Sequence, residues 1–108
     1  MCGITGFTRD EQNMGQVTDL EKMMERIAHR GPDGSGKYFD EDIALGHRRL
    51  SIIDLEGGEQ PMKNEDKTLI CVFNGEIYNY KELKAVLLKK DHIFQTESDT
   101  EVLLHGYE

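Results

Sequence analysis

The sequence is poor in cysteine and has no long apolar run, and both features narrow its class. Only two of its 108 residues are cysteines, Cys2 and Cys71, too few for the disulfide framework of a small secreted domain. Free thiols are therefore expected, in a reduced, cytoplasmic setting. No apolar run approaches the roughly 18 residues of a membrane-spanning helix, and no basic segment followed by an apolar one suggests a secretory signal. We expect no membrane partner.

Positive charge is also scarce. Lysine and arginine together number 13 against 21 aspartates and glutamates, which gives a formal net charge of -8. Nucleic acids and anionic membranes would be repelled by such a chain, so neither is predicted as a partner. The carboxylates are spread along the sequence and form no block, which is typical of a solvated surface.

Several common site motifs are missing as well. The sequence contains no GxGxxG, GxxxxGK[ST], HExxH or CxxC pattern, so dinucleotide, P-loop and zinc templates all fail. The segment Gly34-Ser35-Gly36 does not supply the G-x-S-x-G elbow of a serine hydrolase. The four histidines, which form no i, i+4 pair and are expected to be ordinary surface or structural residues, are His29, His47, His92 and His105. We therefore predict no metal site.

Helices are predicted where apolar residues recur at helical spacing behind a capping residue. The first begins at Thr18, whose capping-box partner is Glu21, and ends before the Gly31-Pro32 turn. Its apolar face consists of Leu20, Met23, Met24, Ile27 and Ala28. A second helix, capped by its first residue, is predicted over residues 79–90, and a third begins at Ser98 and is cut short by the end of the sequence.

Strands are predicted between these helices. They cover residues 3–8, 38–39, 43–48 with a continuation through 50–54, 68–73 and 92–96. The near-continuous hydrophobicity of residues 68–73 predicts burial on both faces. That strand ends at Asn74-Gly75, a dipeptide that favours positive φ and a tight turn. Strands at hairpin-like spacing, interrupted by helices, favour an α+β fold over a doubly wound parallel sheet.

The residue with the clearest chemical potential is Cys2, directly behind the initiator methionine. Removal of Met1 makes Cys2 the N-terminal residue, with a thiol and an α-amine whose ordinary pKa is roughly 7.7–8.0. That amine can act as the base for its own thiol. A retained Met1 would acylate the amine and remove the base. The alternative is that Cys2 occupies its position by chance in a short buried strand.

Three other segments carry polar groups beside apolar strands. Arg49 lies within an apolar strand pair, Asn74-Gly75-Glu76 ends the most apolar strand, and Asp99 follows another strand. Each has an ordinary alternative: a solvent-facing strand residue, a hairpin turn and a helix cap, respectively.

Five motifs occur together and in one order. They are Cys2-Gly3-Ile4, Arg30-Gly31-Pro32-Asp33, Arg49-Leu50-Ser51-Ile52-Ile53-Asp54, Phe73-Asn74-Gly75-Glu76-Ile77-Tyr78-Asn79 and Ser98-Asp99-Thr100-Glu101. The chain resembles the glutaminase domain of glutamine-hydrolysing asparagine synthetases of the B type, which are class II glutamine amidotransferases. The resemblance covers residues 1–108 and implies the four-layer αββα sandwich of N-terminal-nucleophile hydrolases, an α+β fold. The chain would hold the N-terminal half of that domain, without the rest of it and without the ATP-dependent synthetase domain.

The resemblance also implies how L-glutamine is bound. Arg49 would hold the α-carboxylate, because a guanidinium can bind a carboxylate through two parallel hydrogen bonds. Backbone groups of Ile52 and Ile53 would assist it. Glu76 and Asp99 would bind the α-ammonium.

The implied chemistry is nucleophilic. Cys2 would attack the side-chain amide, and the Asn74 side chain and the Gly75 backbone N–H would stabilise the oxyanion. A thioester and then glutamate would follow, and the ammonia would serve ATP-dependent amidation of aspartate. Arg30 and His29 would order the nearby turn and Cys71 would be an inert core thiol.

The implied partners are glutamine and a synthetase domain in the same polypeptide, with a homodimer left open. No cofactor or metal is expected for this part, and ATP and Mg²⁺ belong to the synthetase domain. Three alternatives remain open from the sequence: an inactive or binding-only fragment, the glutaminase half of an amidotransferase with a different acceptor, and an unrelated thiol or interaction protein.

Overall fold

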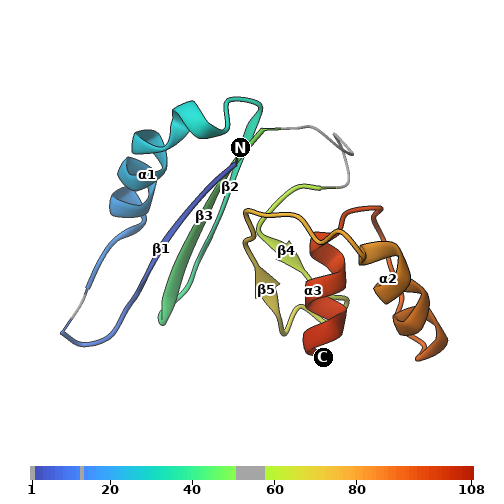
Figure 1. Cartoon of the computed structure of the whole chain (residues 1–108). Helices are drawn as coiled ribbons and strands as arrows, with labels where there is room; N and C mark the ends of the chain where they lie inside the picture. Colours follow the sequence, from blue (N-terminus) through green and yellow to red (C-terminus); the bar gives the residue numbers. More distant parts are fainter. Residues whose placement is uncertain (1, 13, 51–57) are drawn as a thin grey trace.

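The structure, a computed structural model, describes residues 2–12, 14–50 and 58–108 and forms two lobes (Figure 1). The N-terminal lobe, residues 2–50, consists of β1 (Gly3–Thr8), α1 (Val17–Arg26), the 3₁₀ turn η1 (Ala28–Arg30), β2 (Gly34–Phe39) and β3 (Ile43–Arg49). The C-terminal lobe, residues 58–108, consists of β4 (Met62–Lys63), β5 (Ile70–Cys71), α2 (Tyr80–Lys89) and α3 (Thr100–Tyr107). None of the helices in the described residues is long and apolar enough to cross a membrane.

An antiparallel sheet covered by one helix forms the N-terminal lobe. The strand order is β1-β3-β2, with Gly3 opposite Arg48 and Gly34 opposite Arg49. Helix α1 packs on one face of the sheet (Figure 1). The core of the lobe consists of Leu20, Met24 and Ala44, with Phe7 and Phe39 packed against it. The predicted apolar helix face and the strand over residues 3–8 are confirmed.

The first helix begins differently from its prediction. It starts at Val17, and the backbone N–H of Gln16 donates to Asp19 Oδ2 at 2.7 Å. The predicted cap at Thr18 with Glu21 is therefore wrong, because Asp19 satisfies the first turn and Glu21 binds Lys37 at 2.7 Å instead. A helical turn follows up to Arg30, so the predicted end before Gly31 is confirmed.

The strand predicted over residues 68–73 is much shorter. Only Ile70-Cys71 pairs with β4, and both residues are half-buried, so the prediction of a strand buried on both faces is wrong. Side chains take the place of a ladder on either side of this pair. The Leu69 N–H donates to Asn64 Oδ1 at 2.9 Å, and the Phe73 N–H donates to the side-chain oxygen of Gln60.

The strand predicted over residues 92–96 does not form, although the structure describes this whole segment. The N–H groups of Gln95 and Thr96 donate to the Glu101 carboxylate, at 2.8 Å and 2.7 Å. Because one side chain satisfies these backbone donors, the segment needs no neighbouring strand.

The two C-terminal helices differ in burial. Asn79 occupies the N-cap position of helix α2, as predicted, but its side chain makes no capping hydrogen bond. None of the residues of α2, all of which the structure describes, is fully buried. Helix α3 begins two residues after the predicted Ser98 and buries most of its length. The mixed α and β class is confirmed. The four-layer αββα sandwich stays a prediction.

Candidate active site

A cavity of about 460 Å³ is lined by residues of both lobes. Its wall includes six of the predicted site residues: Cys2, Arg49, Asn74, Gly75, Glu76 and Asp99. The other two, Ile52 and Ile53, lie outside the described residues. The fold therefore brings together groups that are far apart in the sequence, while the role of each stays a prediction.

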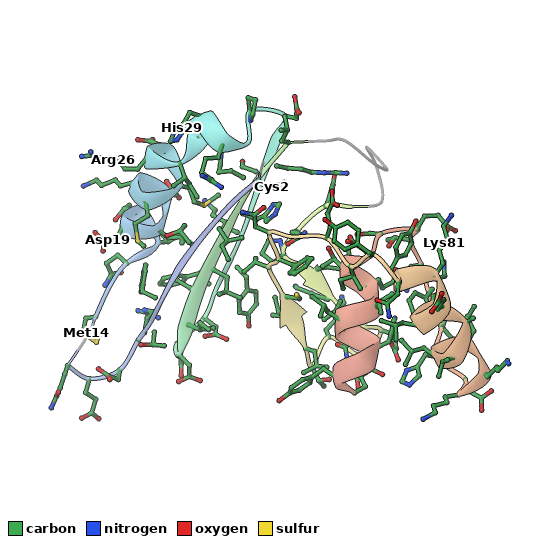
Figure 2. The ribbon with its side chains drawn as sticks, viewed as in Figure 1. Cys2, Met14, Asp19, Arg26, His29 and Lys81 are labelled. Atoms are coloured by element: carbon green, nitrogen blue, oxygen red, sulfur yellow. The ribbon has the colours of Figure 1, made fainter. Side chains whose placement is uncertain are left out.

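The thiol of Cys2 reaches this cavity through strand register. Because β1 and β3 are antiparallel, the start of β1 lies beside the end of β3, where Leu50 follows. The Leu50 N–H donates to Cys2 Sγ at 3.3 Å, and the Leu50 carbonyl lies 3.7 Å from the same sulfur. Arg30 Nε donates to the Cys2 carbonyl at 3.1 Å. Figure 2 shows Cys2 at this end of β1. Hydrogen bonds thus hold both the sulfur and the carbonyl of Cys2 in place.

Arg49 supplies positive charge to the cavity from the last position of β3. Its side chain is 8% exposed, and its backbone carbonyl accepts the Asp33 N–H at 2.9 Å. The carboxylates of Glu76 and Asp99 line the same cavity from the C-terminal lobe. A guanidinium on one lobe and two carboxylates on the other are complementary to the carboxylate and ammonium of an α-amino acid.

The segment that carries Asn74 and Gly75 is fixed at both ends. Gln60 accepts the Phe73 N–H before it, and Asp99 Oδ2 accepts the Ile77 N–H after it at 2.9 Å. The predicted positive φ is wrong, because no described glycine has positive φ and Asn74 has none either. Glycine is needed at position 75 for a different reason: a Cβ there would lie 2.8 Å from the Phe73 ring.

The sequence reasoning missed His47, which lines the same cavity. Its side chain is 1% exposed, and its Nε2 has no hydrogen-bond partner among the described residues. Burial lowers the pKa of His47, a backbone hydrogen bond with Phe73 opposes this, and the nearby Arg49 charge adds to the lowering. The signal was available in the sequence: in a strand, residues two apart face the same side, so His47 accompanies Arg49.

Two further residues named from the sequence, Cys71 and His29, are not part of the cavity lining. Cys71 is half-buried in β5, and burial raises the pKa of its thiol. A raised thiol pKa lowers the thiolate fraction and so fits the predicted inert thiol. His29 is exposed on η1, away from the cavity lining (Figure 2).

Comparison with known proteins places this geometry in a family. Residues 1–108 match the model of the glutamine amidotransferase domain. The chain is 48% identical over 111 aligned positions to asparagine synthetase [glutamine-hydrolyzing] 1 of Bacillus subtilis, an alignment that covers 99% of this chain and 17% of that protein. It is 49% identical over 109 positions to asparagine synthetase [glutamine-hydrolyzing] of Zea mays, covering all of this chain and 18% of the relative.

The chain therefore spans less than a fifth of the length of these curated relatives. The family match, in contrast, extends over the whole chain, including both walls of the cavity. The chain belongs to the glutamine amidotransferase domain family.

Proposed function

We propose that this chain is the glutaminase part of a glutamine-hydrolysing asparagine synthetase. It hydrolyses L-glutamine to glutamate and ammonia, and the ammonia serves the ATP-dependent amidation of aspartate to asparagine on a synthetase domain of the same polypeptide. The observation that carries the proposal is the single cavity that collects a thiol, a guanidinium, an amide and two carboxylates. The relatives named above are glutamine-hydrolysing enzymes by name and match nearly all of this chain.

Glutamine binds across the two lobes in this proposal. Its α-carboxylate pairs with Arg49, and backbone groups of Ile52 and Ile53 assist. Its α-ammonium pairs with Glu76 and Asp99. Both charged groups of the substrate are then neutralised inside a partly buried cavity, where charge-assisted hydrogen bonds are roughly twice as strong as neutral ones.

The reaction begins once Met1 has been removed. The α-amine of Cys2 takes the thiol proton, and the sulfur attacks the side-chain amide carbon of glutamine. The Asn74 side chain and the Gly75 N–H stabilise the oxyanion. The C–N bond then breaks as the α-ammonium returns its proton to the leaving nitrogen, which departs as ammonia. Water attacks the resulting γ-glutamyl thioester, releases glutamate and restores the thiol.

In the proposed reaction, the backbone N–H of Leu50 positions the Cys2 sulfur. It donates to Cys2 Sγ at 3.3 Å and so holds the sulfur at the cavity. This half-reaction needs no cofactor in our proposal, whereas ATP and Mg²⁺ bind the synthetase domain. We also propose a cytoplasmic setting and leave a homodimer open.

The test begins with the mass of the protein produced from its own start codon, which establishes whether residue 1 is Met1 or Cys2. Glutamate release from glutamine is then measured for the wild type and for Cys2→Ala. We expect the Cys2-started protein to release glutamate and the alanine variant to release none above background. ATP and aspartate should then yield asparagine.

Glutamine binding, measured by calorimetry, separates the alternatives. Wild type and Cys2→Ala should both bind glutamine, since Arg49, Glu76 and Asp99 are intact in each. Binding without turnover by a Cys2-started wild type would favour the binding-only alternative. Glutamate release without asparagine formation would assign the ammonia to a different acceptor.

A further inference from the structure

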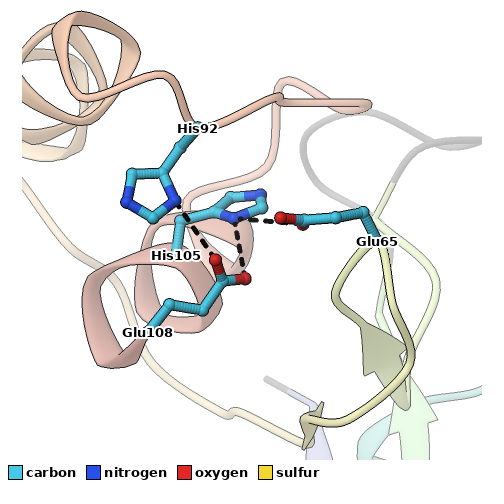
Figure 3. Close-up of side chains that lie close together, drawn as sticks. All are labelled: Glu65, His92, His105 and Glu108. Atoms are coloured by element: carbon cyan, nitrogen blue, oxygen red, sulfur yellow. Dashed lines mark hydrogen bonds and ion pairs between the residues drawn. The ribbon is translucent and has the colours of Figure 1, made fainter.

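Four metal-ligating side chains converge in the C-terminal lobe, outside the cavity described above (Figure 3). They are Glu65 in the loop after β4, His92 after α2, His105 in α3, and Glu108 directly after α3. One donor atom of each lies within 4.8 Å of all the others, and the described residues contain no second group of this kind. We propose that these four residues bind one Zn²⁺ ion.

The spacing of the donors suits a shared cation. His92 Nδ1 lies 3.2 Å from Glu108 Oε2, His105 Nδ1 lies 3.2 Å from Glu108 Oε1, and His105 Nδ1 lies 3.5 Å from Glu65 Oε2. Zinc bonds of about 2.0–2.2 Å place tetrahedral ligands roughly 3.3 Å apart. Direct hydrogen bonds between imidazolium and carboxylate are shorter, about 2.7–2.9 Å. Three of the donor pairs are therefore about as close as neighbouring ligands of one zinc ion, with a different Glu108 oxygen facing each histidine, and the chosen donor atoms all lie within 4.8 Å of one another.

The contact of His105 Nε2 with Glu101 determines which ring nitrogen can bind the metal. His105 is 2% exposed, and its Nε2 lies 3.0 Å from Glu101 Oε2. The same carboxylate accepts the Gln95 N–H at 2.8 Å, and the Thr96 N–H and hydroxyl at 2.7 Å each. Because the Glu101 carboxylate accepts all of these hydrogen bonds, we assign the proton of the His105 ring to Nε2, which donates to it. A buried carboxylate that holds a ligating histidine in this way is typical of zinc sites.

This tautomer leaves the His105 Nδ1 lone pair directed at two further carboxylates, those of Glu65 and Glu108. A lone pair and two anions repel one another unless a cation lies between them. Zn²⁺ places two positive charges at one point and can engage both histidines together with Glu65 and Glu108. An adjoining cavity of about 40 Å³, lined in part by Glu65, Glu101 and His105, gives local room.

The donor set selects the type of metal. Imidazole nitrogen with carboxylate oxygen is a zinc-type combination, while Ca²⁺ and Mg²⁺ prefer oxygen donors alone. Four protein donors close a tetrahedral site, so the ion has a structural role. It joins three segments of the C-terminal lobe, including residues 92–96, which no strand holds. This site is separate from the proposed glutaminase function and replaces our expectation that the chain has no metal site.

Titration of the metal-free protein with ZnCl₂ tests the proposal. After treatment with a chelator, calorimetry should give one Zn²⁺ per chain, with proton release that is seen as a dependence of the heat on the buffer. The melting temperature should rise with zinc concentration. Cobalt substitution should give visible bands without the charge-transfer band of a thiolate, and a variant with Cys2→Ala and Cys71→Ala should bind zinc equally well.

Two ligand variants and one matched control complete the test. His92→Gln and Glu65→Gln change less buried ligands than His105 and should each weaken zinc binding by about 100-fold or more, since even outer partners of a zinc ligand contribute 10–100-fold. The melting temperature without zinc should stay close to that of the wild type. His29→Gln, an exposed histidine in the other lobe, should change neither value. Absence of one-to-one binding in the wild type, or equal affinity in His92→Gln, would show a proton-linked ion-pair cluster and overturn the proposal.

Discussion

The two lobes are stabilised in different ways. In the N-terminal lobe, helix α1 buries Leu20 and Met24 against the sheet, and Leu20 is 0% exposed. In the C-terminal lobe, α2 buries none of its described residues fully, and Val86 is 52% exposed. Side chains such as Glu101 and Asn64 instead satisfy backbone groups that a sheet would otherwise pair. One lobe thus relies on a single apolar cluster beneath its helix, whereas the other combines buried apolar residues of β4 and α3 with buried polar bonds.

The groups of the candidate site are divided along the same line. The N-terminal lobe contributes the thiol of Cys2 and the guanidinium of Arg49, and the C-terminal lobe contributes Asn74 and both carboxylates. The lobe with the apolar cluster therefore holds the proposed nucleophile, while the other lobe holds the proposed oxyanion donors and both carboxylates. Loss of packing and loss of one polar group should accordingly have different consequences.

The largest expected effect comes from the apolar core. Leu20→Ala should lower the free energy of unfolding by about 2–5 kcal/mol, because it leaves a cavity beneath α1. Val86→Ala, the matched control on α2, should change it by less than about 1 kcal/mol, since the side chain is already half in solvent. Urea denaturation measures both. Equal losses would show that the apolar face of α2 is covered in solution and that the two lobes do not differ in this way.

A smaller loss is expected from a polar group of the cavity. Asn74→Ala should lower kcat for glutamate release by roughly 10²–10³-fold, because it removes one of the proposed donors to the oxyanion. The KM for glutamine should change little, since the proposed substrate ligands Arg49, Glu76 and Asp99 are intact. Steady-state kinetics separate the two constants. A rise in KM with kcat unchanged would assign Asn74 to substrate binding alone.

The smallest effect concerns His47, between the lobes. Burial lowers the pKa of His47 below its ordinary value of 6.5, so the unfolded chain binds the proton first as the pH falls. The stability associated with His47 is complete above pH 6.5 and decreases from there down to the pKa of the folded state. In the His47→Gln variant, the urea concentration at the unfolding midpoint should depend less on pH between pH 6.5 and the lower pKa of the folded state. A wild-type midpoint that stays constant across the window would contradict the buried, neutral histidine.

The contribution of Glu101 to the pH dependence of stability lies at lower pH than that of His47. Hydrogen bonds lower the pKa of Glu101 below its ordinary value of 4.5 despite burial, so its stabilisation is present above pH 4.5 and is lost only at lower pH. Measurements between pH 7.5 and 5.5 therefore report on His47 without this contribution.

Much of the N-terminal lobe could be predicted from the sequence, because its signals are local. The spacing of Leu20 and Met24 specifies which face of the helix is buried, and alternating residues specify the strands. Cys2, Arg49, Asn74 and Asp99 were also identified as chemically significant before their positions were known. Their motifs resemble those of one family in sequence order, and the structure places all four in the lining of one cavity.

Only the tertiary structure determined the contacts between residues that are far apart in the sequence, because no local pattern contains such pairs. Residues 68–73 and 92–96 have strand-like composition, yet Gln60, Asn64 and Glu101 satisfy their backbone groups from elsewhere in the chain. Likewise, His92 and His105 are separated in the sequence, and only the packing of α3 brings their ring centroids to a distance of 5.5 Å. Apolar periodicity is repeated along the chain and can be read from it, whereas a single long-range hydrogen bond or ligand pair leaves no period in the sequence.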